Sequence, residues 1–124
     1  MRVLVVDKDA RVRRAVSALL EAADYVVVGV ASAARWAPDL SRRLAPDVVV
    51  LEIDRRRGID DVDVVAELVR RGRIVIAVCS APAHRAAAVA AGAAACLDKD
   101  GRFVEDLANV VRAAAAGPAP PPPA

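Results

Sequence analysis

The sequence of 124 residues predicts an α/β domain in which a five-stranded parallel sheet carries helices on both faces. Five apolar runs, all but the last rich in β-branched residues, lie at residues 3–6, 25–30, 48–53, 74–79 and 94–97. Segments with apolar residues at helical spacing separate these runs. Because strand and helix alternate throughout, consecutive strands need crossover connections, and such connections produce a parallel sheet.

The predicted helices follow the strands in turn, at residues 12–23, 36–44, 62–69, within 82–91, and at 103–114. Asp9 is expected to cap the first helix, and Asp60 or Asp61 the third. Gly72 and Gly117 are expected to end the third and fifth helices. Pro38 fits the second helix only if that helix starts late or bends.

Length and composition predict one folded domain, residues 1–116, followed by a proline-rich tail at residues 117–124 that reads as a linker stub or a disordered end. The net charge of +2 does not indicate a polyelectrolyte partner such as DNA for this segment. No apolar run approaches the ~20 residues of a membrane span, so we expect a soluble, cytoplasmic protein. Two cysteines without close spacing argue against a zinc cluster and favour a reducing compartment.

Polar residues end several of the predicted strands. The carboxyl ends of parallel strands meet at one edge of the sheet, where open α/β sheets place their sites. The residues expected at that edge are Asp7, Lys8, Asp9, Glu52, Cys79, Ser80 and Lys99. Taken alone, Glu52 reads as a strand-end carboxylate paired with one of the arginines at residues 55–57.

Four blocks of the chain resemble the signature blocks of bacterial response-regulator receiver domains. They read VLVVDKDARVRRAVSALL, PDVVVLEID, VIAVCSA and GAAACLDKD, and the resemblance covers residue 2 to about residue 116. It implies the flavodoxin-like (βα)5 receiver fold of two-component systems. Aspartate after the lysine of LDKD resembles the LuxR-type branch, whose receivers precede a helix-turn-helix DNA-binding domain.

The family's chemistry is phosphoryl transfer to an aspartate at the end of the third strand, beside Mg²⁺ held by acids after the first. By resemblance, Glu52 occupies the phosphoacceptor position and Lys99 matches the family's lysine. Asp7 matches the first acid of the metal-binding pair, while Lys8 replaces the second. Asp9 completes this acidic remnant, although we expect it to act as a helix cap and not as a ligand.

Two further family positions concern the switch from site to surface. Cys79 or Ser80 falls at the hydroxyl position after the fourth strand, and the spacing leaves both open. Cys96 stands where the family has its switching aromatic ring. Both cysteines lie on neighbouring predicted strands and are expected to be small core residues in preference to a redox switch.

These substitutions predict a site without catalytic residues, metal or cofactor. An ammonium among the ligands repels Mg²⁺ and removes a carboxylate. The extra methylene of glutamate displaces the nucleophile, and a misplacement of about 1 Å can cost ~10²-fold in rate. We expect Lys8 to act as the metal-replacing cation and, with Lys99, to neutralise Asp7 and Glu52. In that arrangement Glu52 reaches toward Lys99; the alternative is that Lys8 extends into solvent.

The sequence therefore favours an atypical receiver that acts without phosphorylation as a regulatory and dimerisation module of a transcription regulator, and not as an enzyme. The resemblance implies a homodimer through the fourth helix, fifth strand and fifth helix, with DNA bound only through a C-terminal domain absent from this chain. The alternatives are a pseudo-receiver whose pocket senses a small metabolite, and a stand-alone interaction receiver. Catalysis is disfavoured because DKDARVR contains no glycine for a phosphate loop.

Overall fold

Five parallel strands form a single sheet in the order β2-β1-β3-β4-β5. The computed structural model describes residues 1–117, so all but the first residue of the predicted tail lies outside the described residues. The strands are β1 (Arg2–Val6), β2 (Val26–Ala31), β3 (Val48–Ile53), β4 (Ile74–Cys79) and β5 (Ala95–Asp98). The strand order reverses direction between β1 and β3, which places a switch point at their carboxyl ends.

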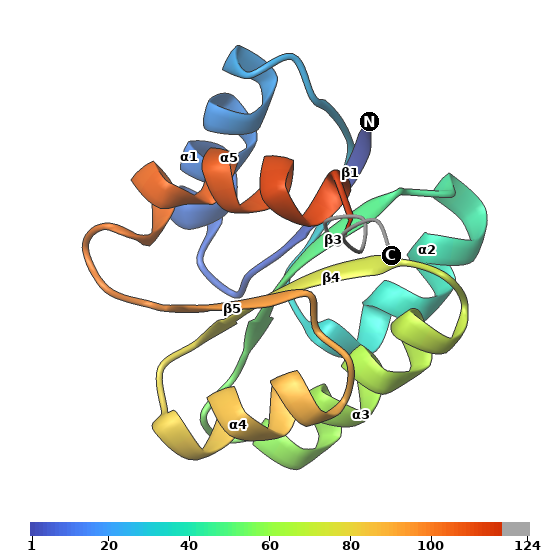
Figure 1. Ribbon diagram of the computed structural model, residues 1–124, viewed down its shortest axis with the longest axis vertical. Helices are drawn as coiled ribbons and strands as arrows, with labels where there is room; N and C mark the ends of the chain where they lie inside the picture. The colour runs from blue at the N-terminus through green and yellow to red at the C-terminus, as the bar shows by residue number, and fades with distance from the viewer. Residues whose placement is uncertain (118–124) are drawn as a thin grey trace, which may run out of the picture.

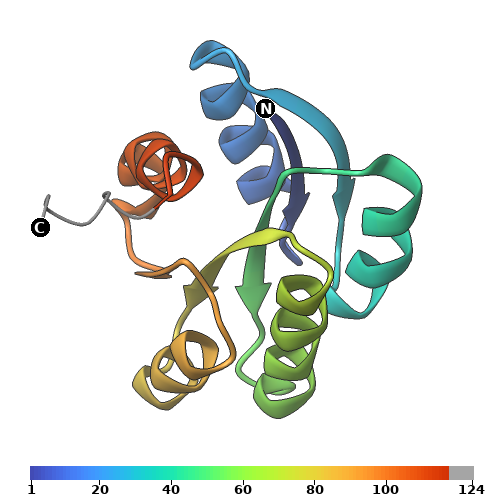
Figure 2. The same cartoon turned by 45° about the vertical axis from the view of Figure 1, so that its right-hand side comes forward.

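Helices cover both faces of this sheet, which confirms the predicted architecture (Figure 1). They are α1 (Ala10–Ala22), α2 (Ala37–Leu44) after the short 3₁₀ turn η1 (Ala34–Trp36), α3 (Gly58–Arg70), α4 (Pro82–Ala90) and α5 (Phe103–Ala115). The turned view separates α1 and α5 on one face from α2, α3 and α4 on the other (Figure 2). None of the helices within residues 1–117 has the length and apolar character that crossing a membrane requires.

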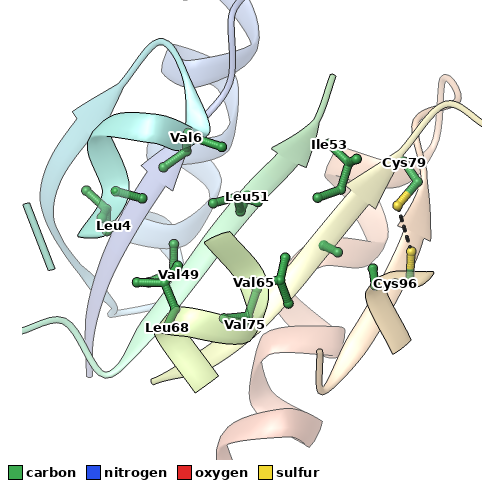
Figure 3. Packing of buried hydrophobic residues seen from close by; sticks show 14 of the residues in the cluster. Leu4, Val6, Val49, Leu51, Ile53, Val65, Leu68, Val75, Cys79 and Cys96 are labelled. Atoms are coloured by element: carbon green, nitrogen blue, oxygen red, sulfur yellow. Dashed lines mark hydrogen bonds between the residues drawn. The ribbon is translucent and has the colours of Figure 1, made fainter. Parts of the chain in front are cut away.

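The central strand β3 is buried along its whole length, as expected for a strand with helices above and below it. Its side chains alternate between two apolar clusters. One cluster faces α2, α3 and α4 and includes Leu51, Ile53 and Leu68 (Figure 3); the other faces α1 and α5 and includes Val50. Each fully buried aliphatic side chain contributes about 1.5–3 kcal/mol, so β3 fixes the position of whatever stands at its carboxyl end.

The expected N-cap of α1 is confirmed, and the expected cap of α3 is wrong. Asp9 accepts a hydrogen bond from the Arg11 amide at 2.9 Å. Helix α3 begins at Gly58, so Asp60 and Asp61 lie in its first turn and neither caps it. Acidic residues are also favoured in the first turn because they face the positive end of the helix dipole, and the sequence did not separate these two placements.

The expected ends of α3 and α5 are confirmed. Gly72 and Gly117 follow the C-caps with φ of +85° and +73°, a conformation that glycine adopts at little cost. Pro38 lies in the first turn of α2, so this helix starts late and does not bend at the proline. Strands β2 and β5 each begin and end one residue later than predicted.

Candidate functional site

Three charged side chains from three strand ends meet at the carboxyl edge of the sheet and form a sheet-edge cluster. Asp7 follows β1, Glu52 is the fifth residue of β3, and Lys99 follows β5. The Lys99 Nζ lies 3.1 Å from Oδ1 and 3.0 Å from Oδ2 of Asp7, and it also contacts Oε2 of Glu52. One ammonium group therefore bridges two carboxylates, and the predicted contact between Glu52 and Lys99 is present.

Backbone amides of the loop after β1 complete the hydrogen bonding of these carboxylates. The Lys8 amide donates to Oε1 of Glu52 at 3.1 Å, and the Asp9 amide donates to Oδ1 of Asp7 at 2.9 Å. Each of the four carboxylate oxygens thus accepts at least one hydrogen bond. The Arg13 guanidinium holds the same loop by donating to the Asp7 carbonyl at 2.7 Å. The site is already satisfied by groups of the chain itself.

Burial makes this bridge electrostatically strong. Asp7 is 4% exposed and Glu52 is 6% exposed, and the Lys99 side chain is 18% exposed. Burial raises the pKa of Asp7, and the hydrogen bonds from the Asp9 amide and Lys99 offset this only in part. Burial lowers the pKa of Lys99, but its hydrogen bonds to Glu52 and Asp7 outweigh that effect, so its pKa is raised overall. Lys99 is therefore a firmly protonated cation.

The structure does not place the Lys8 ammonium between the carboxylates, contrary to the expectation that Lys8 replaces the metal. The Lys8 side chain is exposed, and within residues 1–117 it forms no ion pair. The chain binds Glu52 through the Lys8 backbone amide instead. A strongly hydrated ammonium gains little from burial where Lys99 already bridges both carboxylates. Of the two alternatives, extension into solvent is the one observed, and the cationic role falls to Lys99 alone.

The reading of Glu52 as a partner of the arginines at residues 55–57 is wrong. Within the described residues Glu52 pairs with Lys99, whereas Arg57 approaches Asp60 at 3.9 Å on the surface. The parallel register explains this, because β3 carries Glu52 to the strand edge where the segments after β1 and β5 converge. The arginines lie on the turn leading into α3.

The structure separates the two candidates for the hydroxyl position. Cys79 belongs to the buried cluster between the sheet and α3 and α4, and its Sγ lies 3.0 Å from Sγ of Cys96 on β5 (Figure 3). Ser80 is exposed immediately after β4. Of these two candidates, Ser80 is the one with a hydroxyl group, and it lies at the sheet edge after β4. Both cysteines are buried, as expected.

A neighbouring cavity of about 200 Å³ is lined in part by residues that were not among those expected at the sheet edge. The residues lining it, apart from Asp7, Lys8 and Glu52, include Ser32, Arg35, Asp54, Arg57 and Asp61. Asp61 is 5% exposed and accepts the Asp54 amide at 2.8 Å, and burial raises its pKa. The signal was available, because Asp61 shares one helix face with Val65 and Leu68, both of which are buried.

The residues at the sheet edge do not fit a Mg²⁺ site. Mg²⁺ requires several oxygen ligands in octahedral geometry, but both oxygens of Asp7 already contact the Lys99 ammonium, and the residue after Asp7 is a lysine. Across residues 1–117 no group of three or more His, Cys, Asp or Glu side chains is arranged to hold a metal ion. The donor set suits an internal cation and not a divalent ion.

A protein-family model described as the response regulator receiver domain matches residues 3–112 of the chain. No curated protein sequence matches this chain. Among solved structures, the signal receiver domain of NarL from Mycobacterium tuberculosis is 27% identical with a TM-score of 0.81, over 94% of this chain and 97% of that one. The response regulator domain of Thermotoga maritima CheB is 25% identical with a TM-score of 0.74, over 95% and 98%.

A third solved structure, a DNA-binding response regulator of the LuxR family from Staphylococcus aureus, is 22% identical. Its TM-score is 0.79, over 91% of this chain and 97% of that one. At this identity the similarity shows the shared fold.

Proposed function

Because this chain belongs to the response regulator receiver domain family, we propose that residues 1–116 form a regulatory receiver that works without phosphoryl transfer. The observation that carries the proposal is the position of the Lys99 ammonium, in contact with both Asp7 and Glu52. The Lys99 ammonium compensates the charge of the two carboxylates. In enzymes that transfer phosphoryl groups, a bound metal ion usually has this role.

Two features of Glu52 disfavour its phosphorylation. Its Oε2 contacts the Lys99 ammonium and its Oε1 accepts the Lys8 amide, and both contacts withdraw electron density and make the carboxylate a weaker nucleophile. Its longer side chain also displaces the carboxylate from the position that aspartate would take, and displacements of about 1 Å can lower rates by ~10²-fold. The Glu52–Lys99 pair holds the sheet edge in one arrangement and imitates a phosphorylated site only in part, since a carboxylate carries less charge.

The regulatory output proposed is transcriptional. The solved structure from Staphylococcus aureus is a DNA-binding response regulator of the LuxR family, which supports a role in which this receiver controls a DNA-binding domain. Dimerisation through α4, β5 and α5 is part of this proposal. These elements carry small alanine side chains over much of their surface, which allows close approach but offers few large anchoring residues, so dimerisation is expected to be weak.

Phosphorylation by acetyl phosphate tests the proposal directly. With Mg²⁺ and acetyl phosphate, the wild-type chain should show no acyl phosphate by phosphate-affinity electrophoresis and intact mass measurement. The matched variant is the double substitution Lys8→Asp with Glu52→Asp, which restores both acids at the sheet edge. It should label at least ~10²-fold faster than wild type. Rapid labelling of the wild-type chain that Glu52→Gln abolishes would overturn the proposal.

The cavity beside the cluster favours a second candidate function, the sensing of a small metabolite. Its volume of about 200 Å³ is below the range of roughly 300–1,000 Å³ typical of drug-sized ligands, so it fits only a small molecule. Charges of both signs line it, among them Arg35, Arg57 and Asp54. A zwitterionic metabolite that raises the melting temperature of wild type but not of Arg57→Met would support this candidate; no shift with a panel of amino acids would count against it.

A further inference from the structure

The two cysteines form a pair whose placement goes beyond the sheet-edge cluster. Cys79 ends β4 and Cys96 is the second residue of β5, and their sulfur atoms are 3.0 Å apart. The parallel register sets Cys79 opposite Asp98 and Cys96 opposite Ala77, so the cysteines are diagonal neighbours on one face of the sheet. Figure 3 shows the two side chains pointing toward each other across the strands.

We propose that Cys79 and Cys96 are a thiol pair that peroxide oxidises reversibly to an intramolecular disulfide, and that this bond shifts the segment carrying Lys99. The proposal rests on the sulfur geometry and on the connection of both strands to the sheet-edge cluster. It does not depend on whether Glu52 is phosphorylated, so the labelling experiment above and the experiment below can fail independently.

The geometry favours a direct sulfur–sulfur bond over a bridging metal ion. A disulfide needs about 2.05 Å between the sulfurs, so they must approach by roughly 1 Å from 3.0 Å. Two thiolates bound to tetrahedral zinc, with bonds of ~2.3 Å, would stand roughly 3.8 Å apart and would have to separate. Within residues 1–117 no third ligand joins the pair. We infer that closing this gap draws the end of β4 and the start of β5 toward each other.

The surroundings distinguish the roles of the two thiols. Cys96 is 9% exposed and Cys79 is 2% exposed, so a small oxidant reaches Cys96 first. The hydrogen bond with Cys79 lowers the pKa of Cys96 against the opposing effect of burial, and the Arg85 guanidinium adds to the lowering. Arg85 is itself held by Asp98 at 2.8 Å. The pKa of Cys79 is raised by its hydrogen bond to Cys96 and by burial. Cys96 is therefore the attacking thiolate and Cys79 the resolving thiol.

The chemistry balances with hydrogen peroxide as the oxidant. The Cys96 thiolate attacks one peroxide oxygen and breaks the O–O bond, which gives a sulfenic acid and hydroxide; the hydroxide takes up the proton that Cys96 has lost and becomes water. The Cys79 sulfur then attacks the Cys96 sulfur, the S–O bond breaks, and the Cys79 proton leaves with the departing oxygen as a second water. Two thiols are oxidised to one disulfide, and one peroxide is reduced to two waters.

The disulfide would act on the sheet-edge cluster through short connections. Lys99 lies three residues after Cys96, and its amide donates to the Cys79 carbonyl at 2.8 Å. The Nζ of the same residue bridges Asp7 and Glu52. A displacement of β5 by a fraction of an ångström therefore changes the distance from Lys99 to both carboxylates. In this protein a thiol pair replaces the aromatic ring of the family as the group that couples β5 to the sheet edge.

The test treats the whole chain with stoichiometric hydrogen peroxide and measures its intact mass under denaturing, non-reducing conditions. The expected result is a monomer that has lost two hydrogens and regains them with dithiothreitol. Cys79→Ala should instead accumulate a sulfenic acid at Cys96 that dimedone captures. The matched control is Cys79→Ala with Ser80→Cys, which keeps two thiols but moves one to the neighbouring position, and it should form no disulfide.

Two measurements test the proposal, the amide resonances near the sheet edge and the state of the thiols after peroxide. Backbone amide resonances of Lys99 and Glu52 should shift between the reduced and oxidised wild-type chain and stay in place in the control variant. Thiols that remain free after peroxide, or a disulfide that forms only between chains, would overturn the pair as an oxidation site. A disulfide that forms without any change in the Lys99 resonance would overturn its coupling to the sheet edge.

Discussion

Glu52 and Asp61 are buried to nearly the same degree, at 6% and 5% exposure, but they are stabilised by different means. Glu52 accepts hydrogen bonds from a charged ammonium and from a backbone amide. Asp61, which lines the cavity beside it, accepts the Asp54 amide and has no ion pair within residues 1–117. Burial raises the pKa of Asp61, as it raises that of Asp7. Neighbouring carboxylates of equal burial thus differ in whether a cation compensates their charge.

This difference shows which of the buried carboxylates have a counter-ion. A buried charge that has lost hydration is costly unless a counter-ion or several hydrogen bonds replace the water. Lys99 provides such a counter-ion for Glu52 and Asp7, in the form of an ammonium group of the chain itself. Asp61 has only a neutral donor and binds a proton more readily than an exposed aspartate. The sheet-edge cluster therefore forms one charged unit, and Asp61 stands outside it.

Removing the Lys99 ammonium should produce the largest loss of stability. Lys99→Met leaves Asp7 and Glu52 buried without a counter-ion, and breaking one side of a buried ion pair typically costs about 3–5 kcal/mol. Urea unfolding at pH 7 measures this loss. Adding Asp7→Asn and Glu52→Gln to Lys99→Met removes both uncompensated charges, so the triple variant should recover most of the stability. A loss no smaller in the triple variant than in Lys99→Met would show that packing, and not charge, explains the effect.

The ion pairs of Lys99 also predict that the protein loses stability at alkaline pH. The pKa of Lys99 is raised above its ordinary value of 10.5 in the folded chain. Its contribution to stability is therefore complete below pH 10.5 and is lost as the pH rises through the raised value. The free energy of unfolding of the wild-type chain should fall in that range, and Lys99→Met should lack this part of the fall.

Asp61→Asn should raise the free energy of unfolding, by less than Lys99→Met lowers it. Because the pKa of Asp61 is raised, its charged form is penalised in the folded state at pH 7, and that penalty disappears below its ordinary pKa of 3.8. Asparagine keeps an acceptor for the Asp54 amide and carries no charge. We expect a gain of about 0.5–2 kcal/mol at pH 7, which shrinks as the pH falls toward 3.8.

The control for this substitution is Asp61→Ala. It removes the acceptor as well as the charge and leaves the Asp54 amide without its partner, at a cost of about 1–3 kcal/mol. Chemical denaturation of both variants at pH 7 and pH 4 separates the two effects. Equal stability of the asparagine and alanine variants would show that Asp61 does not act through this hydrogen bond.

The fold could be predicted from the sequence because its signals are redundant. β3 is apolar on both faces and is flanked by helical segments on either side in the chain, so periodicity, length and strand order all agree. The strand order placed Glu52 and Lys99 at one edge of the sheet, but the expectation that they touch depended on the resemblance to receiver domains, because taken alone Glu52 was assigned to the arginines at residues 55–57. Positions fixed by strand ends were thus accessible to sequence reasoning.

The direction of individual side chains was not accessible in the same way. Lys8 and Asp7 are adjacent, and the sequence alone does not say which of them turns inward; the structure buries Asp7 and leaves Lys8 exposed. A long lysine side chain extends toward water wherever its backbone allows it. Asp61 was one of two candidates for the cap of the third helix, although its spacing from Val65 placed it on the buried face. Residue type and periodicity gave opposite answers there, and periodicity was correct.

The smallest expected effect belongs to Lys8, and it sharpens the distinction between the two lysines. Lys8→Met removes an exposed ammonium that has no ion pair within residues 1–117, and such surface substitutions usually change stability by less than about 0.5 kcal/mol. The Lys8 amide still donates to Glu52, because the substitution leaves the backbone unchanged. Urea unfolding beside Lys99→Met provides the measurement. A loss near that of Lys99→Met would mean that the Lys8 ammonium compensates the carboxylates in solution, as the metal-replacing role required.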